Sequence, residues 1–524
     1  MAMNEDRFEG AERENPRRRP KEPKWKTTIK YYILPIILMA ALVSMMVVMV
    51  VGITGCFNRN SAAGSTTAAT TDPTTEPTSE PTTEATVPQS EVDAAAAELI
   101  KKTDLLAAGY YYDDAITAIS AFEHLYRSPE ASQKLAEYQA AKASAKRYES
   151  MDTITHIFFH SLIVDTDRAF GKGSYQKGGY NQWMTTVDEF KFLLNSMYER
   201  GFVLVTPYQV AYEVTDENGK AKFVEGDIYL PEGKKPFLMS QDDVNYYGNM
   251  IADSDAGINS TPVFASKKGD GFAHKIIIGE DGKPTCEYMD KDGNILVGEY
   301  DLVPILEAFI QEHPDFAYQG ARAVLGVTGY EGVFGYRVKP GYAKNMTAEA
   351  YAKEVEGAKA ITQCLKDNGW IIASHSYGHP NYSFPDEKTA QGKANRVAKD
   401  VAKFKDRVEF VIGECDIIIY PHGADVAGNE MYSLDNPSFK VLYEAGYRYF
   451  FNVNSSDYWV QMGEDYYRGG RRNVDGYRMW YHPYKLDDLM GSKIIQYYDK
   501  NNNLVEKEVS EAFDKGRPCP VPQV

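Results

Sequence analysis

The sequence predicts an α/β fold, a distorted or incomplete (β/α) barrel over residues 151–524. From Ile154 onward, short apolar stretches typical of buried strands alternate with amphipathic stretches typical of helices. Polar residues follow several of these strands, and (β/α) barrels assemble their sites at the carboxyl ends of strands. The turn sequences Asp281-Gly282 and Asp292-Gly293 predict hairpins inserted into the barrel.

The region before the barrel predicts a membrane tether. Residues 1–30 carry nine Lys/Arg against six Asp/Glu and predict a disordered tail. Residues 31–55 carry no charge and are long enough for a transmembrane helix. Because basic residues lie mainly before this span, we expect a cytoplasmic N-terminus and an extracellular catalytic domain at the cell membrane. An alternative anchor is a lipid on Cys56, since Ile53-Thr54-Gly55-Cys56 resembles a lipoprotein processing site.

Two further segments separate the anchor from the barrel. Residues 56–90 are rich in Thr, Pro and Ser without an apolar period, which predicts an extended linker. Residues 91–150 are Ala-rich with a helical pattern that Gly109 interrupts, which predicts a helical hairpin. No second copy of this unit occurs, so a repeat array is not supported.

Composition excludes some classes of function. The net charge of −17 argues against a nucleic-acid partner. The five cysteines lack CxxC spacing, so neither a disulfide framework nor a thiolate zinc site is expected. Nothing in the sequence sets an oligomeric state.

The barrel elements follow one another along the chain. Strands are expected at 154–159, 202–205, 237–240, 322–327, 370–373, 417–420 and 447–453, and helices at 187–200, 302–310 and 348–366.

Polar residues at the strand ends suit a divalent metal. His375 and His379 follow one strand and lie on one face if the chain turns helically there. Asp242 and Asp243 follow another strand, and adjacent side chains of an extended chain point apart. We therefore expect one aspartate to bind the metal and the other to accept a proton from water. His160 ends the first strand.

Four stretches resemble the sequential motifs of the polysaccharide deacetylases of the NodB-homology type (carbohydrate esterase family four). They are FLMSQDDV at 237–244, SHSYGH at 374–379, YPHG at 420–423 and NSSDYW at 454–459, and the resemblance covers roughly residues 151–490.

The resemblance implies a role for each site residue. Asp242 would be the catalytic base, and His160 the acid that some members carry on their first strand. Asp243, His375 and His379 would bind the metal, usually Zn²⁺ and sometimes Co²⁺ or Ni²⁺.

The resemblance also implies a substrate. The family removes N-acetyl groups from glycans such as chitin, peptidoglycan and poly-N-acetylglucosamine, so an N-acetylated polysaccharide is the expected partner. The residues expected to line its groove are Tyr420, Pro421, His422, Gly423, Asp457 and Trp459.

Departures from the family pattern leave alternatives open. Gln241 replaces a Phe, Val244 replaces a Gly and Ile419 replaces an Arg, which would fit a catalytically decayed glycan-binding protein. The same water chemistry would also serve a hydrolase of another amide or ester. His482 is an alternative acid, and Arg471-Arg472 is interpreted as a solvated charge run.

Overall fold

The computed structural model describes residues 87–251, 269–454, 456 and 458–524. The predicted tail and transmembrane helix lie outside these residues, as do the linker up to residue 86 and Asp457. Within the described part, no helix is both long enough and apolar enough to cross a membrane.

Seven parallel strands close into a barrel. Around the ring the order is β11, β12, β13, β14, β16, β2 and β7, and β7 pairs again with β11. This agrees with the predicted (β/α) barrel, and seven strands rather than eight complete the ring. The strands are β2 (Thr155–Phe159), β7 (Lys235–Gln241), β11 (Val324–Val327), β12 (Ile371–Ser374), β13 (Ile417–Ile419), β14 (Tyr449–Val453) and β16 (Tyr467–Asn473).

A short eighth strand distorts the ring beside β7. β3 (Phe202–Leu204) pairs with the first half of β7, and β11 pairs only with Ser240 and Gln241 at its end. The ring therefore closes between β7 and β11 immediately before the paired aspartates.

β16 was not predicted from the sequence. Its residues, Tyr-Arg-Gly-Gly-Arg-Arg-Asn, lack the apolar run or alternation that indicates a strand. It nevertheless completes the ring between β14 and β2, and its three arginines are all buried.

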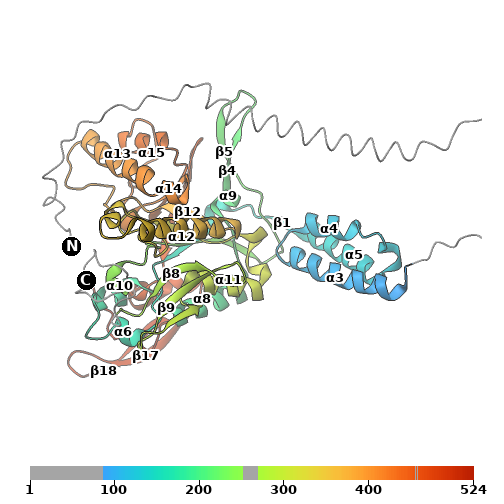
Figure 1. The fold of residues 1–524 in the computed structure, drawn as a ribbon, viewed down its shortest axis with the longest axis horizontal. Coiled ribbons are helices and arrows are strands. Elements are labelled where there is room, and N and C mark those ends of the chain that lie inside the picture. Colours follow the sequence, from blue (N-terminus) through green and yellow to red (C-terminus); the bar gives the residue numbers. More distant parts are fainter. Residues whose placement is uncertain (1–86, 252–268, 455, 457) are drawn as a thin grey trace, which may run out of the picture. The chain divides into compact units, whose positions relative to one another are not determined.

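Helices cover the outside of the barrel on the predicted segments (Figure 1). They include α8 (Val187–Glu199), α11 (Leu302–Glu312) and α12 (Ala348–Asp367). α8 begins with a capping box, in which Thr186 Oγ1 accepts from Glu189 N–H and Glu189 accepts from Thr186 N–H. Its apolar face packs Phe190 and Leu193 into the core.

Hairpins are inserted into the barrel, two of them at the predicted turns Asp281-Gly282 and Asp292-Gly293. β4 (Ala211–Thr215) pairs with β5 (Ala221–Glu225), and β8 (Ala273–Ile278), β9 (Pro284–Met289) and β10 (Ile295–Gly298) form a three-stranded sheet. A further hairpin, β17 (Ser492–Tyr498) and β18 (Leu504–Ser510), lies near the C-terminus.

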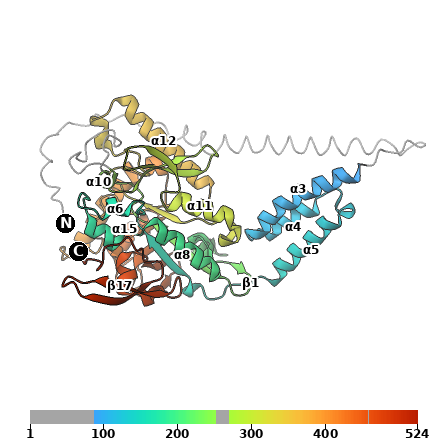
Figure 2. The same ribbon diagram turned by 90° about the horizontal axis from the view of Figure 1, so that it is seen from below.

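Within the described residues 87–150, three α-helices, rather than the two predicted, precede the barrel, and Figure 2 labels each of them. They are α3 (Gln89–Ala108), α4 (Tyr112–Ser120) and α5 (Pro129–Ser144), with a small core of their own. Gly109 separates the first two, as expected. The third begins at Ser128, whose Oγ accepts from Ala131 N–H, followed by a proline at the first helical position. That start signal is obscured by the continuous Ala-rich pattern.

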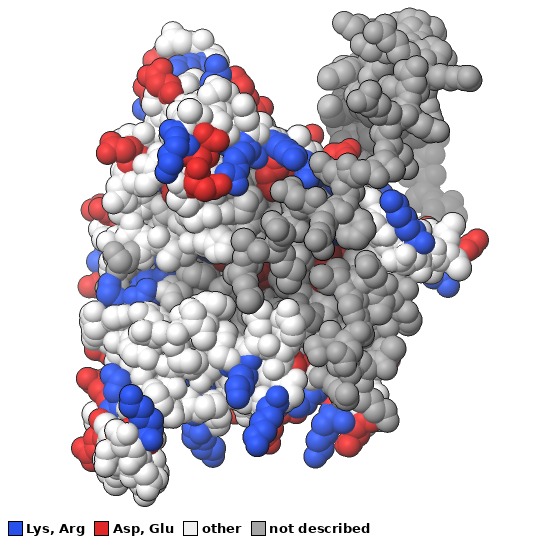
Figure 3. All heavy atoms as spheres, turned by 90° about the vertical axis from the view of Figure 1, so that its left-hand side faces the viewer, with Lys and Arg blue, Asp and Glu red and all other residues white. Residues whose placement is uncertain are grey.

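The face shown in Figure 3 carries both Lys/Arg and Asp/Glu residues, separated by a larger uncharged area.

Candidate metal centre

Asp243, His375 and His379 come together at the carboxyl ends of β7 and β12. Their ligand atoms all lie within 4.8 Å of one another. Three atoms so placed can all lie within about 2.8 Å of a common point, so a small contraction gives the roughly 2.0–2.2 Å bonds of zinc. One carboxylate and two imidazoles leave coordination positions open, as catalytic metal sites require. The donor set therefore fits a divalent metal.

His375 is held in one orientation by the backbone of β13. Its buried ring places Nδ1 at 2.9 Å from the carbonyl oxygen of Ile419. Because a carbonyl only accepts, Nδ1 carries the proton and Nε2 keeps its lone pair for a metal. The residue that stands where the family has an arginine thus fixes a ligand through its main chain.

Left-handed backbone turns, rather than a helical turn, bring His379 next to His375. Ser376 has φ 68° and His379 has φ 53°. Ser376 Oγ accepts from the N–H of His379 at 2.9 Å, and the two imidazole centroids lie 4.9 Å apart. Burial lowers the pKa of His379, opposed by the nearby charge of Asp243, which favours the neutral, metal-binding ring.

A carboxylate on α13 (Ala390–Arg407) holds this same loop. Asp400 accepts from the N–H groups of Tyr377 and Gly378 at 2.8 and 2.9 Å and from the hydroxyl of Tyr382 at 2.9 Å. These bonds fix the chain between the two histidines, so Asp400 positions His379 without facing the metal.

Asp243 is turned toward the imidazoles by its own left-handed conformation, φ 57°. The hydroxyl of Tyr247 donates to Oδ1 at 2.6 Å, and Oδ2 lies 3.9 Å from Nε2 of His379. Burial alone would raise the pKa of Asp243, but His379 and His375 hold it below its ordinary value. The carboxylate is therefore ionised and has one oxygen directed at the centre.

Asp242 points to the other side, as the alternation of an extended chain predicts. Arg471 donates to its two oxygens at 2.6 and 2.8 Å, inside the barrel. Burial would raise the pKa of Asp242, yet the guanidinium and then His375 hold it well below its usual range. Oδ2 lies 3.9 Å from Nε2 of His375, so the ionised carboxylate borders the metal centre.

The interpretation of Arg471-Arg472 as a solvated charge run is wrong. Arg471 is buried and binds Asp242, and Arg472 is buried and donates to both oxygens of Asp488 at 2.9 and 3.0 Å. Their charges are compensated by carboxylates from distant segments, which a local pattern cannot reveal.

Buried contacts accommodate the other two departures from the family pattern, Gln241 and Val244. The amide of Gln241 donates to Asp301 at 3.0 and 3.1 Å, and more weakly to the carbonyl of His160 at 3.4 Å. Val244 is fully buried and is not among the left-handed residues, because that conformation falls on Asp243.

His160 lies at the edge of the centre. Its half-buried ring places Nδ1 at 3.2 Å from the carbonyl oxygen of Trp183, and its charge acts on the pKa of both Asp242 and Asp243. By contrast, the pKa of His482 is lowered by burial and then by the charges of Arg478, Lys485 and Lys507, none of which belongs to the centre. The acid role of His160 stays a prediction.

The expected groove residues differ in whether their side chains lie near the metal ligands or in the core. His422 (φ 57°) lies beside the ligands, with its ring centroid 4.6 Å from that of His379. Trp459 is half-buried and lies against Arg468. Tyr420 instead points into the core, where its hydroxyl is 2.7 Å from that of Tyr432.

The remaining two described groove residues shape the backbone. Pro421 is buried, and Gly423 has φ 65° with no room for a side chain, since a Cβ would lie 2.4 Å from Val453. Neither offers a polar side chain to a ligand.

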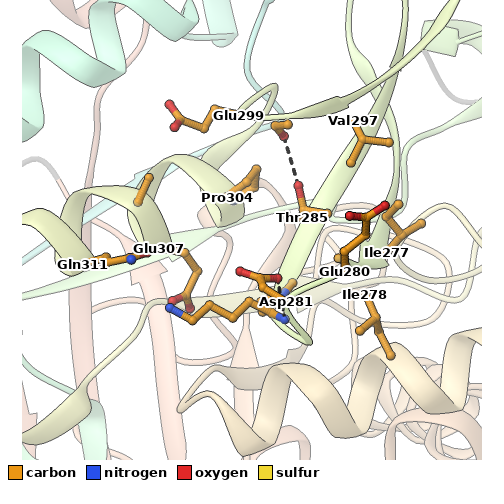
Figure 4. Close-up of a pocket in the computed structure, with 15 residues that line it drawn as sticks. Ile277, Ile278, Glu280, Asp281, Thr285, Val297, Glu299, Pro304, Glu307 and Gln311 are labelled. Atoms are coloured by element: carbon orange, nitrogen blue, oxygen red, sulfur yellow. Dashed lines mark hydrogen bonds between the residues drawn. The ribbon is translucent and has the colours of Figure 1, made fainter.

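Two cavities of the described residues lie away from the metal ligands. One of about 560 Å³ separates α11 from the β8–β9–β10 sheet (Figure 4). Its carboxylates include Glu307, which already binds Arg322 and Trp370, and Asp281, which accepts from the backbone of its own turn. These two carboxylates thus already have partners within the fold. The other, lined by tyrosines, is described below.

No protein-family model matches this sequence, and no curated protein matches it. Among solved structures, the chain is similar to the structure of IcaB from Ammonifex degensii. The sequence identity is 12% and the TM-score is 0.31, with 61% of this chain and 91% of that chain covered. At this level the likeness carries no weight in assigning a function, which depends on the residues themselves.

Proposed function

We propose that this protein is a metal-dependent hydrolase that removes N-acetyl groups from an extracytoplasmic glycan. The observation that carries the proposal is the pairing of two adjacent carboxylates at the metal centre. Asp243 joins His375 and His379 within 4.8 Å, while Asp242 is kept ionised beside them by Arg471. A centre with a ligand carboxylate and a separate ionised carboxylate suits water activation.

Each residue has a distinct task in this scheme. A divalent metal, most simply Zn²⁺, supplies the Lewis acidity that acidifies water and polarises an acyl carbonyl. Asp242 accepts the proton of the attacking water, and Arg471 keeps its carboxylate oriented. His160, at the edge of the centre, donates a proton to the leaving nitrogen.

The substrate class and location follow from the sequence motifs and the tether. The four deacetylase-like stretches favour an N-acetylated amino sugar over other amides, and the predicted span at 31–55 would hold the barrel outside the cell. The three candidate ligands within 4.8 Å of one another, and the carboxylate of Asp242 bound by Arg471, argue for catalysis over a decayed glycan-binding role.

The test uses the full-length chain purified in detergent. The protein is stripped with a chelator, reloaded with Zn²⁺, and assayed for acetate release from N-acetylglucosamine oligomers. We expect release that depends on metal and that is lost in His375→Ala together with bound metal, measured by elemental analysis. His482→Ala is the matched control and should retain activity.

Two results would count against the proposal. Equal metal content in wild type and in His375→Ala would show that His375 does not bind a metal and that the proposed centre does not exist. Zinc-loaded protein that cleaves simple acyl esters or other amides, but not the acetylated oligomers, would favour the alternative hydrolase.

A further inference from the structure

A groove lined by tyrosines lies at the opposite end of the barrel from the metal centre. It has a volume of about 580 Å³, within the range of ligand sites. Tyr229 comes just before β7 and Tyr318 before β11, whereas the metal ligands follow the carboxyl ends of strands. We propose that this groove binds an amino-sugar polymer with free ammonium groups, a class that rests on the proposed function because it is that reaction's product.

The floor of the groove is fixed by two buried tyrosines. The hydroxyl of Tyr110 donates to the carbonyl of Asp315 at 2.7 Å, and the hydroxyl of Tyr318 accepts from the N–H of Tyr229 at 3.3 Å. Their ring centroids lie 5.5 Å apart. These two rings are thus structural, and they hold the walls in place.

The tyrosines that form the walls of the groove are less buried than the two that form its floor. Tyr111 and Tyr112 are half-buried and Tyr229 is exposed, and their hydroxyls have no hydrogen-bond partner among the residues that the structure describes. Side chains that only sealed a packing interface would close the space and bury their hydroxyls. Here three rings border open volume with free donors, which suits a ligand rich in hydroxyls and amines.

The backbone around the groove adopts unfavourable conformations to build it. Tyr110 has φ 67° and Gln319 has φ 47°, and the N–H of Gln319 donates to the carbonyl of Gly109 at 2.9 Å. At Gly320 (φ 74°) a Cβ would lie 2.7 Å from the hydroxyl of Tyr111. Strained residues of this kind gather at ligand sites, where the surroundings hold them.

The charge of the groove favours a cation. Asp113 pairs with Lys142, so these two charges compensate each other. Asp114 is exposed, has no ion-pair partner among the described residues, and borders the same rings. Tyrosine faces and a carboxylate both attract an ammonium group, whereas an N-acetylated sugar has no charge to offer.

The test measures binding rather than catalysis. The full-length chain carrying His375→Ala, which disables the proposed centre, is titrated calorimetrically with glucosamine oligomers and with N-acetylglucosamine oligomers. We expect tighter binding of the glucosamine oligomers, weakened at least tenfold by Tyr111→Ala/Tyr229→Ala and weakened by Asp114→Asn. Tyr126→Ala, an exposed tyrosine outside the groove, is the matched control.

Specific outcomes would overturn the inference. Equal affinity for the two oligomers would show that ammonium groups are not recognised. Unchanged binding in the Tyr111→Ala/Tyr229→Ala variant would show that the oligomer does not bind in this groove. Tyr111→Phe/Tyr229→Phe keeps the rings and guards against misfolding, and we expect intermediate affinity. If acetate release fails in every assay while this binding persists, the groove stands and the proposed reaction falls.

Discussion

Two arginines on β16 each meet a buried aspartate, but the two pairs are built differently. Arg468 and Arg471 are three residues apart, so they point to opposite faces of the strand. Asp425, the partner of Arg468, also accepts from Tyr432 at 3.0 Å and Asn452 at 3.1 Å. Arg468 in turn donates to three further oxygens, those of Gly428, Glu430 and Gln461.

The pair inside the barrel, Arg471 and Asp242, makes fewer hydrogen bonds. The side chain of Asp242 accepts only from Arg471, and Nε of Arg471 has no partner among the described residues. A carboxylate whose lone pairs are all used can only stabilise the fold. One with spare lone pairs beside metal ligands can also accept a proton, and this difference separates a structural pair from a functional one.

The largest expected effect breaks the functional pair. Asp242→Asn should lower kcat about 10²- to 10⁴-fold, because the proton acceptor is lost. Metal content should be unchanged, as judged by elemental analysis, since Asp242 is not a ligand. Asp425→Asn is the matched variant and should leave kcat of the folded protein near wild type. Equal losses of kcat in the two variants would show that the two aspartates do not differ in function.

Breaking the structural pair should instead affect stability. Arg468→Met leaves Asp425 buried without its cation and should lower the free energy of unfolding by about 3–5 kcal/mol. Chemical denaturation measures this change. Arg468→Met/Asp425→Leu removes the stranded charge and should recover part of it. No recovery would mean that the surrounding hydrogen bonds, rather than the unpaired charge, dominate.

A third kind of carboxylate only positions a ligand. Asp400→Ala frees the loop between the two histidines and should weaken zinc affinity by about 10- to 100-fold. Competition with a zinc-binding dye measures the affinity. Asp386→Ala, a surface aspartate paired with Arg396, should change nothing. Unaltered affinity in Asp400→Ala would show that the loop holds its shape without this carboxylate.

The smallest expected effect reports on the burial of His156 inside the barrel, beside Arg471. Burial and then Arg471 hold the pKa of His156 well below its usual range. Below about pH 6.5 the unfolded chain binds a proton there and the folded chain does not, so stability falls as pH drops, by up to about 1.4 kcal/mol per pH unit.

His156→Gln should therefore flatten the loss of stability between about pH 6.5 and 5.5. Denaturant unfolding at several pH values measures the slope, with His124→Gln outside the barrel as the control. An unchanged slope would mean that other groups carry the acid sensitivity.

Local patterns in the sequence predicted the strands that bear the site. The apolar runs before Asp242 and His375 are continuous, and the polar residues that follow them mark the strand ends. Turn dipeptides likewise placed the inserted hairpins. These features depend on neighbours in the chain, so they can be recognised without the fold.

What the sequence did not reveal depends on distant partners. β16 is a strand because its arginines reach Asp425, Asp242 and Asp488, which lie far from it along the chain or on other elements. The supports of the centre, Tyr247 and Asp400, are ordinary residues until the fold brings them near.

Four residues around the metal centre, Asp243, Ser376, His379 and His422, share a backbone conformation that L-amino acids avoid. Each departs from the preferred geometry at a cost of about 1–2 kcal/mol. Glycine at any of them would relieve that backbone cost, yet would remove a metal ligand, the hydroxyl that holds His379, or the imidazole beside it. Selection for an unstrained backbone alone would therefore favour glycine at these positions, and the barrel would lose its metal ligands or their supports.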